Sequence, residues 1–307
     1  MISTRESYGK ALEELGEKYP NIVVLDADLS TATMTKYFAK KYPDRFLDMG
    51  ISEADMIGTA AGLSTCGKIP FASTFAVFAA GRAYDQIRTS VCYPKNNVKI
   101  VGSHSGITVG EDGATHQMLE DVNLMRGFPN MNIIAPCDDI STRWAVEEAI
   151  KIHGPVYIRT SRPKVDSVYT EGETFEFGKG KVHGDGKDVA IFTYGITTLE
   201  AIKAMKILEE KNIHARVIDL ITLKPVDKNL IVETAKEVDN IVTVEDHSII
   251  GGIGTIVSEV LCEIYPKEIY RIGIKDEFGH SGKWDELMKE YFLDSEGIVK
   301  EICMRYY

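Results

Sequence analysis

Short apolar runs alternate with amphipathic segments along the first half of the chain. The apolar runs are rich in β-branched residues and predict strands at 21–26, 46–48, 69–74, 97–103, 131–135 and 156–159. Helical patterns cover 3–18, 53–63, 82–91 and 141–152. Ser3 and Glu6 have the spacing of a capping box at the start of the first helix. Apolar strands that alternate with helices are typical of a parallel sheet covered by helices.

The same rhythm returns after a polar break. Residues 163–187 are rich in Gly, Lys, Asp and Glu and predict a linker with a hairpin-like stretch. Strands are then predicted at 188–195, 215–220, 240–246 and 269–274, and helices at 198–211, from 227, at 256–264 and from 285. The sequence thus predicts an α/β protein of two domains, each an open, mostly parallel sheet flanked by helices. The expected limits are 1–165 for the first domain, 166–187 for the linker and 188–307 for the second domain.

Composition and charge narrow the possible partners. Hydrophobic residues make up 44% of the 307 residues and charged residues 26%, as in ordinary globular proteins. The net charge of −11 argues against nucleic acid and anionic membrane surfaces as partners. No apolar run reaches the ~18 residues of a membrane span, and the acidic, amphipathic amino terminus is unlike a signal peptide. The five cysteines form no CxxC pair, so neither a disulfide framework nor a zinc site is suggested. We expect a cytoplasmic protein.

Ligands of open parallel sheets bind beyond the carboxyl ends of the strands, so chemistry is expected in the segments that follow strands. The segment 103–117 is the densest of these and holds His104, Glu111, Asp112 and His116 with three glycines. Two histidines and a carboxylate suit a site that binds hydroxyls and moves protons near neutral pH. The same composition also fits a solvated loop.

Two further segments have a functional and a structural interpretation. Glu53 begins a helix of small residues that is expected to be buried, so its carboxyl group needs a strong hydrogen-bond partner. The alternative is that Glu53 only caps its helix. Phe75 and Phe78, three residues apart after a strand, either fill the core or form a platform for a flat heterocycle.

These segments resemble a known family. GISEADMIGTAAGL (50–63), STFAVF (73–78) and GEDGATHQ (110–117), in this order and spacing, resemble the pyrimidine-binding domain of transketolase. VIDLITLKPVD (217–227), VEDHSIIGGIGTIVSEVL (244–261) and FGHSG (278–282) resemble the carboxyl-terminal domain of the same family. The resemblance covers nearly the whole chain.

The resemblance implies roles toward thiamine diphosphate. Glu53 matches the catalytic glutamate, whose carboxyl group bonds the pyrimidine and favours the imino tautomer that takes the thiazolium proton. Phe75 and Phe78 match the pocket around the pyrimidine ring, although Gly81 stands where many full-length transketolases have a tyrosine. Asp28 matches an aspartate near the cofactor, and its other interpretation is a turn former at a strand end.

The resemblance also implies roles toward the sugar. His104, Asp112 and His116 match residues that contact the carbonyl and hydroxyl oxygens of the substrate, and the two histidines count as catalytic. Arg5 and Arg162 match two arginines that bind the terminal phosphate, for which a planar guanidinium is well suited. Alone, Arg5 would be a solvated helix arginine. The phosphate-binding serine of the family is not clearly present, and Ser30 or Thr31 could take its place.

The family's magnesium motif, GDG followed about 25–30 residues later by Asn, belongs to a preceding domain. Gly184-Asp185-Gly186 and Asn212 have a similar spacing, but they lie in a charged turn and at a helix end. We expect no metal ligands in this chain. The expectation is therefore the carboxyl-terminal subunit of a split transketolase of the pentose phosphate pathway. An amino-terminal subunit would bind the diphosphate and Mg²⁺ or a similar ion, in an α2β2 heterotetramer that acts on sugar phosphates.

Other functions remain open from the sequence. Within the superfamily, the β subunit of a thiamine-dependent 2-oxoacid dehydrogenase has a similar second half, and His104 with His116 argues for a sugar instead. A synthase that condenses pyruvate with glyceraldehyde phosphate is normally one long chain. A catalytically silent regulatory subunit is disfavoured by the presence of Glu53 and both histidines. His247 and His280 are expected to be structural.

Overall fold

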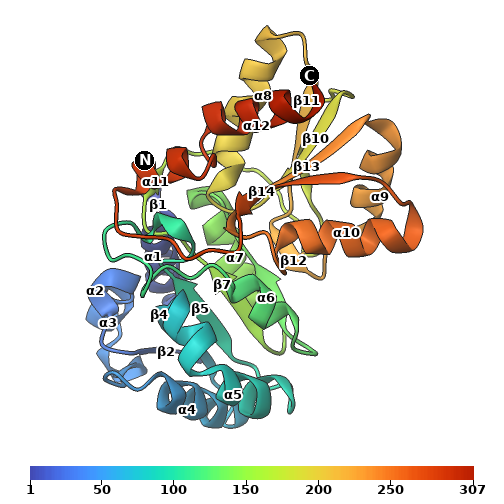
Figure 1. Ribbon diagram of the computed structural model, residues 1–307. Helices are drawn as coiled ribbons and strands as arrows, with labels where there is room; N and C mark the ends of the chain where they lie inside the picture. Colours follow the sequence, from blue (N-terminus) through green and yellow to red (C-terminus); the bar gives the residue numbers. More distant parts are fainter. The chain divides into compact units, whose positions relative to one another are not determined.

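The structure is a computed structural model that describes residues 1–307, and the chain divides into two units (Figure 1). The first unit combines residues 1–105 with 124–173, and the second combines 106–123 with 174–307. The internal segment 106–123 therefore packs with the second unit, although it lies within the first predicted domain in chain order. The reason is local: Ile107 and Leu119 lie in the hydrophobic core of the second unit. The domain limits expected at residues 165 and 188 remain a prediction.

A parallel sheet forms the centre of the first unit. Its strands run in the order β6-β7-β5-β4-β2-β3 and every neighbouring pair is parallel. The strands are nearly all buried, as expected for a sheet with helices on both faces. Their bounds are β2 (Ile22–Asp26), β3 (Phe46–Asp48), β4 (Ile69–Phe75), β5 (Lys99–Ser103), β6 (Asn132–Ile134) and β7 (Val156–Arg159).

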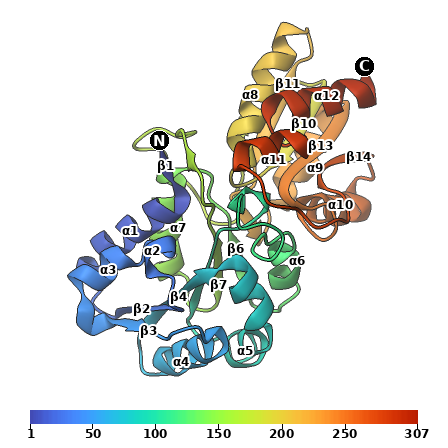
Figure 2. The same cartoon turned by 60° about the vertical axis from the view of Figure 1, so that its left-hand side comes forward.

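Helices cover both faces of this sheet. The views of Figures 1 and 2 show α1 with α7 on one face and α4 with α5 on the other. The bounds in this unit are α1 (Thr4–Lys18), α2 (Ser30–Thr33), α3 (Lys36–Lys41), η1 (Pro43–Arg45), α4 (Glu53–Thr65), α5 (Tyr84–Gln86) and α7 (Asp139–Lys151), while α6 (Asp121–Arg126) crosses the boundary between the units. The predicted cap of α1 is present, since Ser3 Oγ accepts a hydrogen bond from Glu6 N at 3.4 Å.

The segment predicted as one regular helix over 82–91 differs from the expectation. It consists of two wide π-helical stretches, η2 (Phe78–Arg82) and η3 (Ile87–Cys92), on either side of the short α5. A π turn inserts an extra residue per turn, and such turns are frequent at functional sites. The hydrophobic period of the sequence does not reveal them, because the same apolar side chains remain buried.

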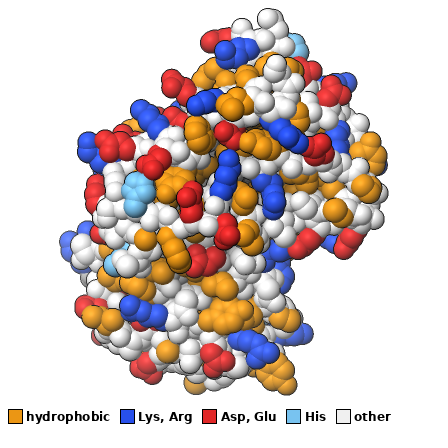
Figure 3. Space-filling model, viewed as in Figure 1, with side chains coloured by type: hydrophobic (Ala, Val, Ile, Leu, Met, Phe, Trp, Pro, Cys, Tyr) orange, Lys and Arg blue, Asp and Glu red, His pale blue; other side chains and the backbone are white.

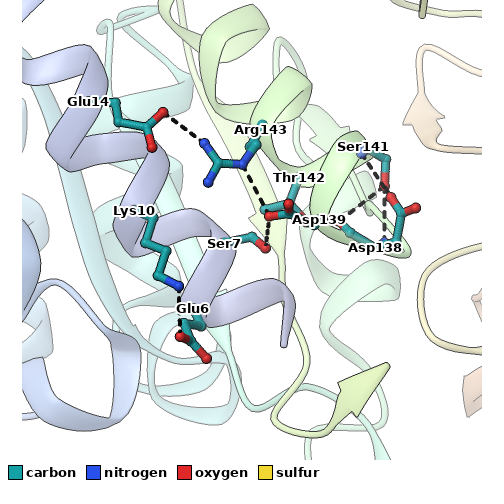
Figure 4. Close-up of polar contacts among 9 residues, drawn as sticks. All are labelled: Glu6, Ser7, Lys10, Glu14, Asp138, Asp139, Ser141, Thr142 and Arg143. Atoms are coloured by element: carbon teal, nitrogen blue, oxygen red, sulfur yellow. Dashed lines mark hydrogen bonds and ion pairs between the residues drawn. The ribbon is translucent and has the colours of Figure 1, made fainter. Parts of the chain in front are cut away.

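Helices α1 and α7 are joined by a polar network (Figure 4). Arg143 of α7 pairs with Glu14 of α1 at 2.8 Å and with Asp139 at 3.2 Å. Asp139 also accepts a hydrogen bond from Ser7 of α1. A capping box at Asp138 begins α7, with Ser141 N donating to the Asp138 carboxylate at 2.9 Å. The network fixes the amino-terminal helix that carries Arg5.

The second unit is also an α/β layer structure. Its sheet runs in the order β14-β13-β10-β11-β9, parallel except for β9. In Figure 2, α8 and α12 lie on one face of this sheet and α9 and α10 on the other. The bounds are η4 (Ile107–Val109), β9 (Lys181–His183), β10 (Val189–Thr193), α8 (Thr197–Glu210), β11 (Ala215–Asp219), β12 (Thr222–Lys224), α9 (Lys228–Glu237), β13 (Asn240–Ser248), α10 (Ile253–Ile264), β14 (Ile269–Ile274), α11 (Trp284–Glu290) and α12 (Ser295–Tyr306).

Acidic and basic side chains are interspersed on the face drawn in Figure 3, among scattered apolar patches. That face presents no continuous basic field of the kind that binds a phosphate backbone. None of the helices is both long and apolar enough to cross a membrane.

Candidate active site

Four predicted site residues lie at the carboxyl ends of four neighbouring strands of the first unit. Strands β2, β4, β5 and β7 are adjacent in the sheet. Asp28 follows β2, Phe75 ends β4, His104 follows β5 and Arg162 comes three residues after β7. Because parallel strands end at the same edge, the fold gathers these residues at that edge.

Glu53 is the first residue of α4 and only 4% of its surface is exposed. Its two carboxylate oxygens lie 3.2 and 3.4 Å from Nη1 of Arg82, so the strong partner that a buried glutamate needs is an arginine. Ser52 holds the N-cap position of the helix, and no side-chain cap hydrogen bond is formed there. The Glu53 carboxylate therefore faces Arg82 instead of capping its own helix.

The aromatic residues form a stacked pair. The rings of Phe75 and Phe78 are nearly parallel, with centroids 5.8 Å apart and an interplanar angle of 12°. The guanidinium carbon of Arg82 lies 4.0 Å from the centroid of Phe78. Gly81 faces open space, since a Cβ atom there would meet nothing within 4 Å.

His104 is held in one tautomer by its neighbours. Its Nε2 lies 3.3 Å from Nη1 of Arg5, and its Nδ1 lies 2.8 Å from Oγ of Ser103. An arginine can only donate, so Nε2 accepts and the ring proton is on Nδ1, directed at Ser103. The residue is 3% exposed, has a φ of +55° and packs on Phe75 with ring centroids 3.9 Å apart. The contacts of His104 thus join the aromatic pair to Arg5.

Arg5 and Arg162 are brought together by a short antiparallel ladder. Strands β1 (Ile2–Ser3) and β8 (Lys164–Val165) pair with Ser3 opposite Lys164. Arg5 comes two residues after Ser3 and Arg162 two residues before Lys164, so both arginines lie at the same end of the ladder. The pKa of Arg5 is lowered from its ordinary value, first by burial and secondly by the nearby charge of Arg162. Nη1 of Arg5 donates to the carbonyl of Ala32 at 2.7 Å, while its buried Nε has no hydrogen-bond partner in the chain. Two like charges held this close suit an anionic ligand.

Asp28 is exposed and adopts a φ of +60° in the turn after β2. The turn is held by Asp26, which is fully buried and accepts hydrogen bonds from Leu29 N at 2.7 Å and Thr33 Oγ1 at 2.6 Å. Burial raises the pKa of Asp26 to about 6. Asp26 therefore shapes the loop that carries Asp28 and the two hydroxyl residues, Ser30 and Thr31.

Asp112 and His116 belong to the second unit. They lie on a loop of residues 106–119, here called the histidine loop. Asp112 is exposed and His116 is half-buried. Nδ1 of His116 lies 2.9 Å from Oγ1 of Thr115.

The residues that were not assigned to the site make contacts within the second unit. Nε2 of His280 pairs with Glu290 at 2.9 Å, and this hydrogen bond raises the pKa of His280. His247 is fully buried, with Nδ1 2.6 Å from the carbonyl of Ser248. In the turn that contains Asp185, the carbonyl of Gly186 accepts a hydrogen bond from Nε of Arg216 at 2.6 Å.

Three residues near the predicted site were not singled out from the sequence: Arg82, Asp26 and Ser103. Arg82 lies 29 residues from Glu53, and no periodic pattern connects them. Asp26 had a detectable signal, because a carboxylate at the end of an apolar strand must find donors. Ser103 stands next to His104 and could have been found as the partner that fixes its tautomer.

Family models match both halves of the chain. Residues 1–167 match "Transketolase, pyrimidine binding domain" and residues 178–298 match "Transketolase, C-terminal domain". The chain belongs to the transketolase family. The resemblance predicted from the sequence motifs is thereby confirmed, as is the fold of two mostly parallel α/β domains.

Similar proteins include separate transketolase subunits. A protein of Methanocaldococcus jannaschii named as a transketolase C-terminal section is 52% identical over 97% of this chain and 94% of its own length. A 6-deoxy-6-sulfo-D-fructose transketolase subunit of Clostridium sp. (strain MSTE9) is 40% identical over 96% of this chain and 92% of its own length. A solved structure described as "Split gene transketolase, inactive beta4 tetramer" is 51% identical, covers 98% of this chain and 97% of its own, and has a TM-score of 0.91.

Proposed function

We propose that this chain is the carboxyl-terminal subunit of a split transketolase. The enzyme transfers a two-carbon ketol unit from a ketose phosphate to an aldose phosphate and is active only with an amino-terminal subunit. Two similarities support the split arrangement, because the relative named as a C-terminal section and the split-gene structure both match this chain over nearly their whole length. A cytoplasmic α2β2 heterotetramer in the pentose phosphate pathway remains part of this proposal.

One juxtaposition carries the proposal: the buried carboxylate of Glu53 and the stacked rings of Phe75 and Phe78 share Arg82 as a neighbour. An aromatic surface can stack on a flat, nitrogen-containing ring, and a carboxyl group can hydrogen-bond a nitrogen at the edge of that ring. These residues therefore fit the pyrimidine of thiamine diphosphate. When bound, this cofactor supplies the acidic carbon that adds to the carbonyl group of the sugar.

Residues of this chain bind and orient the cofactor. Glu53 shares a proton with a pyrimidine nitrogen through its carboxyl oxygens. Phe75 and Phe78 orient the ring and exclude water from its face. Asp28, beside the cofactor, completes its binding. Mg²⁺ and the diphosphate group are assigned to the amino-terminal subunit, following the family pattern.

The sugar is assigned to the histidines, Asp112 and the arginine pair. His116 and Asp112 hydrogen-bond the hydroxyl and carbonyl oxygens, and a histidine moves a proton at such an oxygen near neutral pH. His104 accepts from Arg5 in this structure and so also orients the phosphate-binding guanidinium. Arg5 and Arg162 bind the terminal phosphate through charge-assisted hydrogen bonds.

The arginine pair also speaks against the β subunit of a 2-oxoacid dehydrogenase. The short carboxylic substrate of such an enzyme has no distal phosphate to bind. By contrast, Arg162 lies close enough to Arg5 for its charge to lower the Arg5 pKa, as expected of an anion site. The exposed turn with Ser30 and Thr31 adds hydroxyl groups on the same side, since Arg5 bonds the carbonyl of Ala32.

The test is reconstitution. The purified chain, an amino-terminal transketolase subunit, thiamine diphosphate and Mg²⁺ are combined and assayed for ketol transfer between sugar phosphates. We expect turnover in the mixture and none with either chain alone. Turnover by this chain alone would remove the two-subunit arrangement. Decarboxylation of 2-oxoacids without ketol transfer would favour the dehydrogenase subunit.

A further inference from the structure

The histidine loop is a closed and internally braced unit. Gly106 N donates to the carbonyl of Met118 at 2.9 Å, which joins the two ends of the loop. The side chain of Gln117 lies inside, 5% exposed, and its Nε2 donates to the carbonyls of Ile107 at 3.3 Å and His280 at 2.9 Å. Compact loops with adjacent ends are Ω loops, and they frequently carry function.

Asp246, near the end of β13, holds the beginning of this loop. Its carboxylate is 1% exposed. Oδ1 accepts a hydrogen bond from Ile107 N at 2.7 Å, and Oδ2 accepts one from Thr108 Oγ1 at 2.9 Å. Two hydrogen bonds to one buried side chain hold two successive residues of the loop, Ile107 and Thr108, at the same point. Asp246 is thus an anchor that lies 139 residues from Ile107 in sequence.

The backbone is adapted to this carboxylate. Gly106 has a φ of +75°, and a Cβ atom there would lie 2.1 Å from Oδ2 of Asp246. Only a glycine allows the loop to turn at this point and to approach the carboxylate so closely.

The other end of the loop is bound to the same strand end. Ser248 N donates to the carbonyl of Leu119 at 2.8 Å. The side chains of Ile107 and Leu119 are buried in the core of the second unit. At the far part of the loop, Gly113 packs against Ser281, where a Cβ atom would lie 2.6 Å from the serine Oγ. The whole histidine loop therefore moves with the carboxyl-terminal domain.

We propose that Asp246 is a positioning residue of the ketol-transfer reaction, which fixes the histidine loop so that Asp112 and His116 stand in one place. The carboxyl-terminal domain thereby acquires a catalytic task, as the support of a substrate-binding loop. The inference rests on the proposed function, because it assumes that Asp112 and His116 contact the sugar. Misplacement of a catalytic group by about 1 Å can cost on the order of 100-fold in rate.

The loop itself can be tested on the full chain without a partner. Amide hydrogen exchange over residues 106–119 is followed by mass spectrometry for the wild type, Asp246→Ala and Asp246→Asn. We expect at least about tenfold faster exchange in Asp246→Ala. Asp246→Asn should stay near the wild type, because its amide oxygen can accept from Ile107 N and its amide nitrogen can donate to the Thr108 hydroxyl.

Glu245→Ala is the matched control. Glu245 is the preceding residue of β13 and fully buried, but its carboxylate accepts from Ile253 N at 2.7 Å and Gly254 N at 3.1 Å, at the start of α10. This variant should lose stability without faster exchange in the histidine loop. If Asp246→Ala does not fold, Thr108→Val removes one of the two anchoring bonds and keeps the shape of the side chain. Unchanged exchange of the loop in the folded variants would overturn the anchor.

The catalytic part is measured in the assembled enzyme. We expect Asp246→Ala to lower kcat/KM for sugar phosphates on the order of 10- to 100-fold. Exchange of the thiazolium proton, which needs no sugar, should be unchanged, and Asp246→Asn should recover most of the activity. Equal losses in Asp246→Ala and Glu245→Ala would assign Asp246 a merely structural role. A wild-type assembly without ketol transfer would remove the proposed function and the catalytic task together, while the loop exchange would still decide the anchor.

Discussion

Arg82 Nη1 lies 3.2 Å from Oε1 of Glu53, an ion pair between a buried carboxylate and a side chain that is 53% exposed. When this pair opens, the arginine can return to water, but the buried carboxylate then needs another hydrogen-bond partner. Arg82 occupies the oxygens that a pyrimidine nitrogen would need, and its guanidinium covers the ring of Phe78. Arg82 therefore competes with the proposed cofactor for both of its recognition elements.

Removal of this competitor should tighten cofactor binding. For Arg82→Met in the assembled enzyme, we expect a Kd for thiamine diphosphate lower by up to about fivefold, because the cofactor no longer has to displace the arginine from Glu53. Isothermal titration with constant Mg²⁺ measures it. Arg88→Met is the control, an exposed arginine on η3 of the same segment. Weaker binding in Arg82→Met alone would mean that Arg82 assists the cofactor.

Glu53→Gln should nearly abolish turnover and leave the fold intact. An amide keeps the size of the side chain but cannot share or release a proton as a carboxyl group does. The defect should therefore appear as slow exchange of the thiazolium proton for deuterium, before any sugar binds. Asp55→Asn, an exposed acid in the same helical turn, should exchange like the wild type. Normal exchange in Glu53→Gln with low activity would exclude the activating role.

Arg162→Ala should raise the KM for phosphorylated sugars far more than for unphosphorylated ones. A charge-assisted hydrogen bond contributes about 1.5–3 kcal/mol, which corresponds to roughly 10- to 150-fold. Steady-state kinetics with matched pairs of sugars measure the difference. Lys151→Ala, which removes only a surface ion pair with Glu148 within α7, is the control and should leave the KM of both sugars unchanged. An equal effect on both sugars in Arg162→Ala would take the phosphate role from this residue.

Asp26 should make stability depend on pH. Burial raises the pKa of Asp26 from 3.8 to about 6, so the folded state binds its proton more tightly than the unfolded state. Between these two values the wild type should lose stability relative to Asp26→Asn as the pH rises. The expected change is about 2–3 kcal/mol, measured by urea unfolding at pH 4, 5 and 6. A constant difference across this range would show that the carboxyl group does not titrate there.

The sequence predicts the elements of this fold well, because strand and helix periods reflect burial directly. It also predicts that the site lies at the carboxyl ends of β2, β4, β5 and β7, since the parallel topology places these ends at one edge of the sheet. It does not predict the partner of Glu53, because Arg82 lies 29 residues away on another element and no periodic pattern connects the two residues.

The histidine loop shows a second limit. Nothing near Gly106 in the sequence indicates that the loop is bound by Asp246 of a distant strand. An aspartate inside VEDHS looks like any polar residue at a strand end. Its role depends on a contact across 139 residues, and a single sequence carries no signal for such a contact.

The ladder between β1 and β8 makes the arginine pair depend on a contact between two distant segments of the chain. Thr4 Oγ1 accepts from Ser161 N at 2.8 Å, a contact between residues 157 positions apart. Arg5 and Arg162 therefore become neighbours only when these two distant segments of the first unit have met. A change that loosens the ladder should thus separate the two arginines and leave the stacked rings of Phe75 and Phe78, which lie on other elements, in contact.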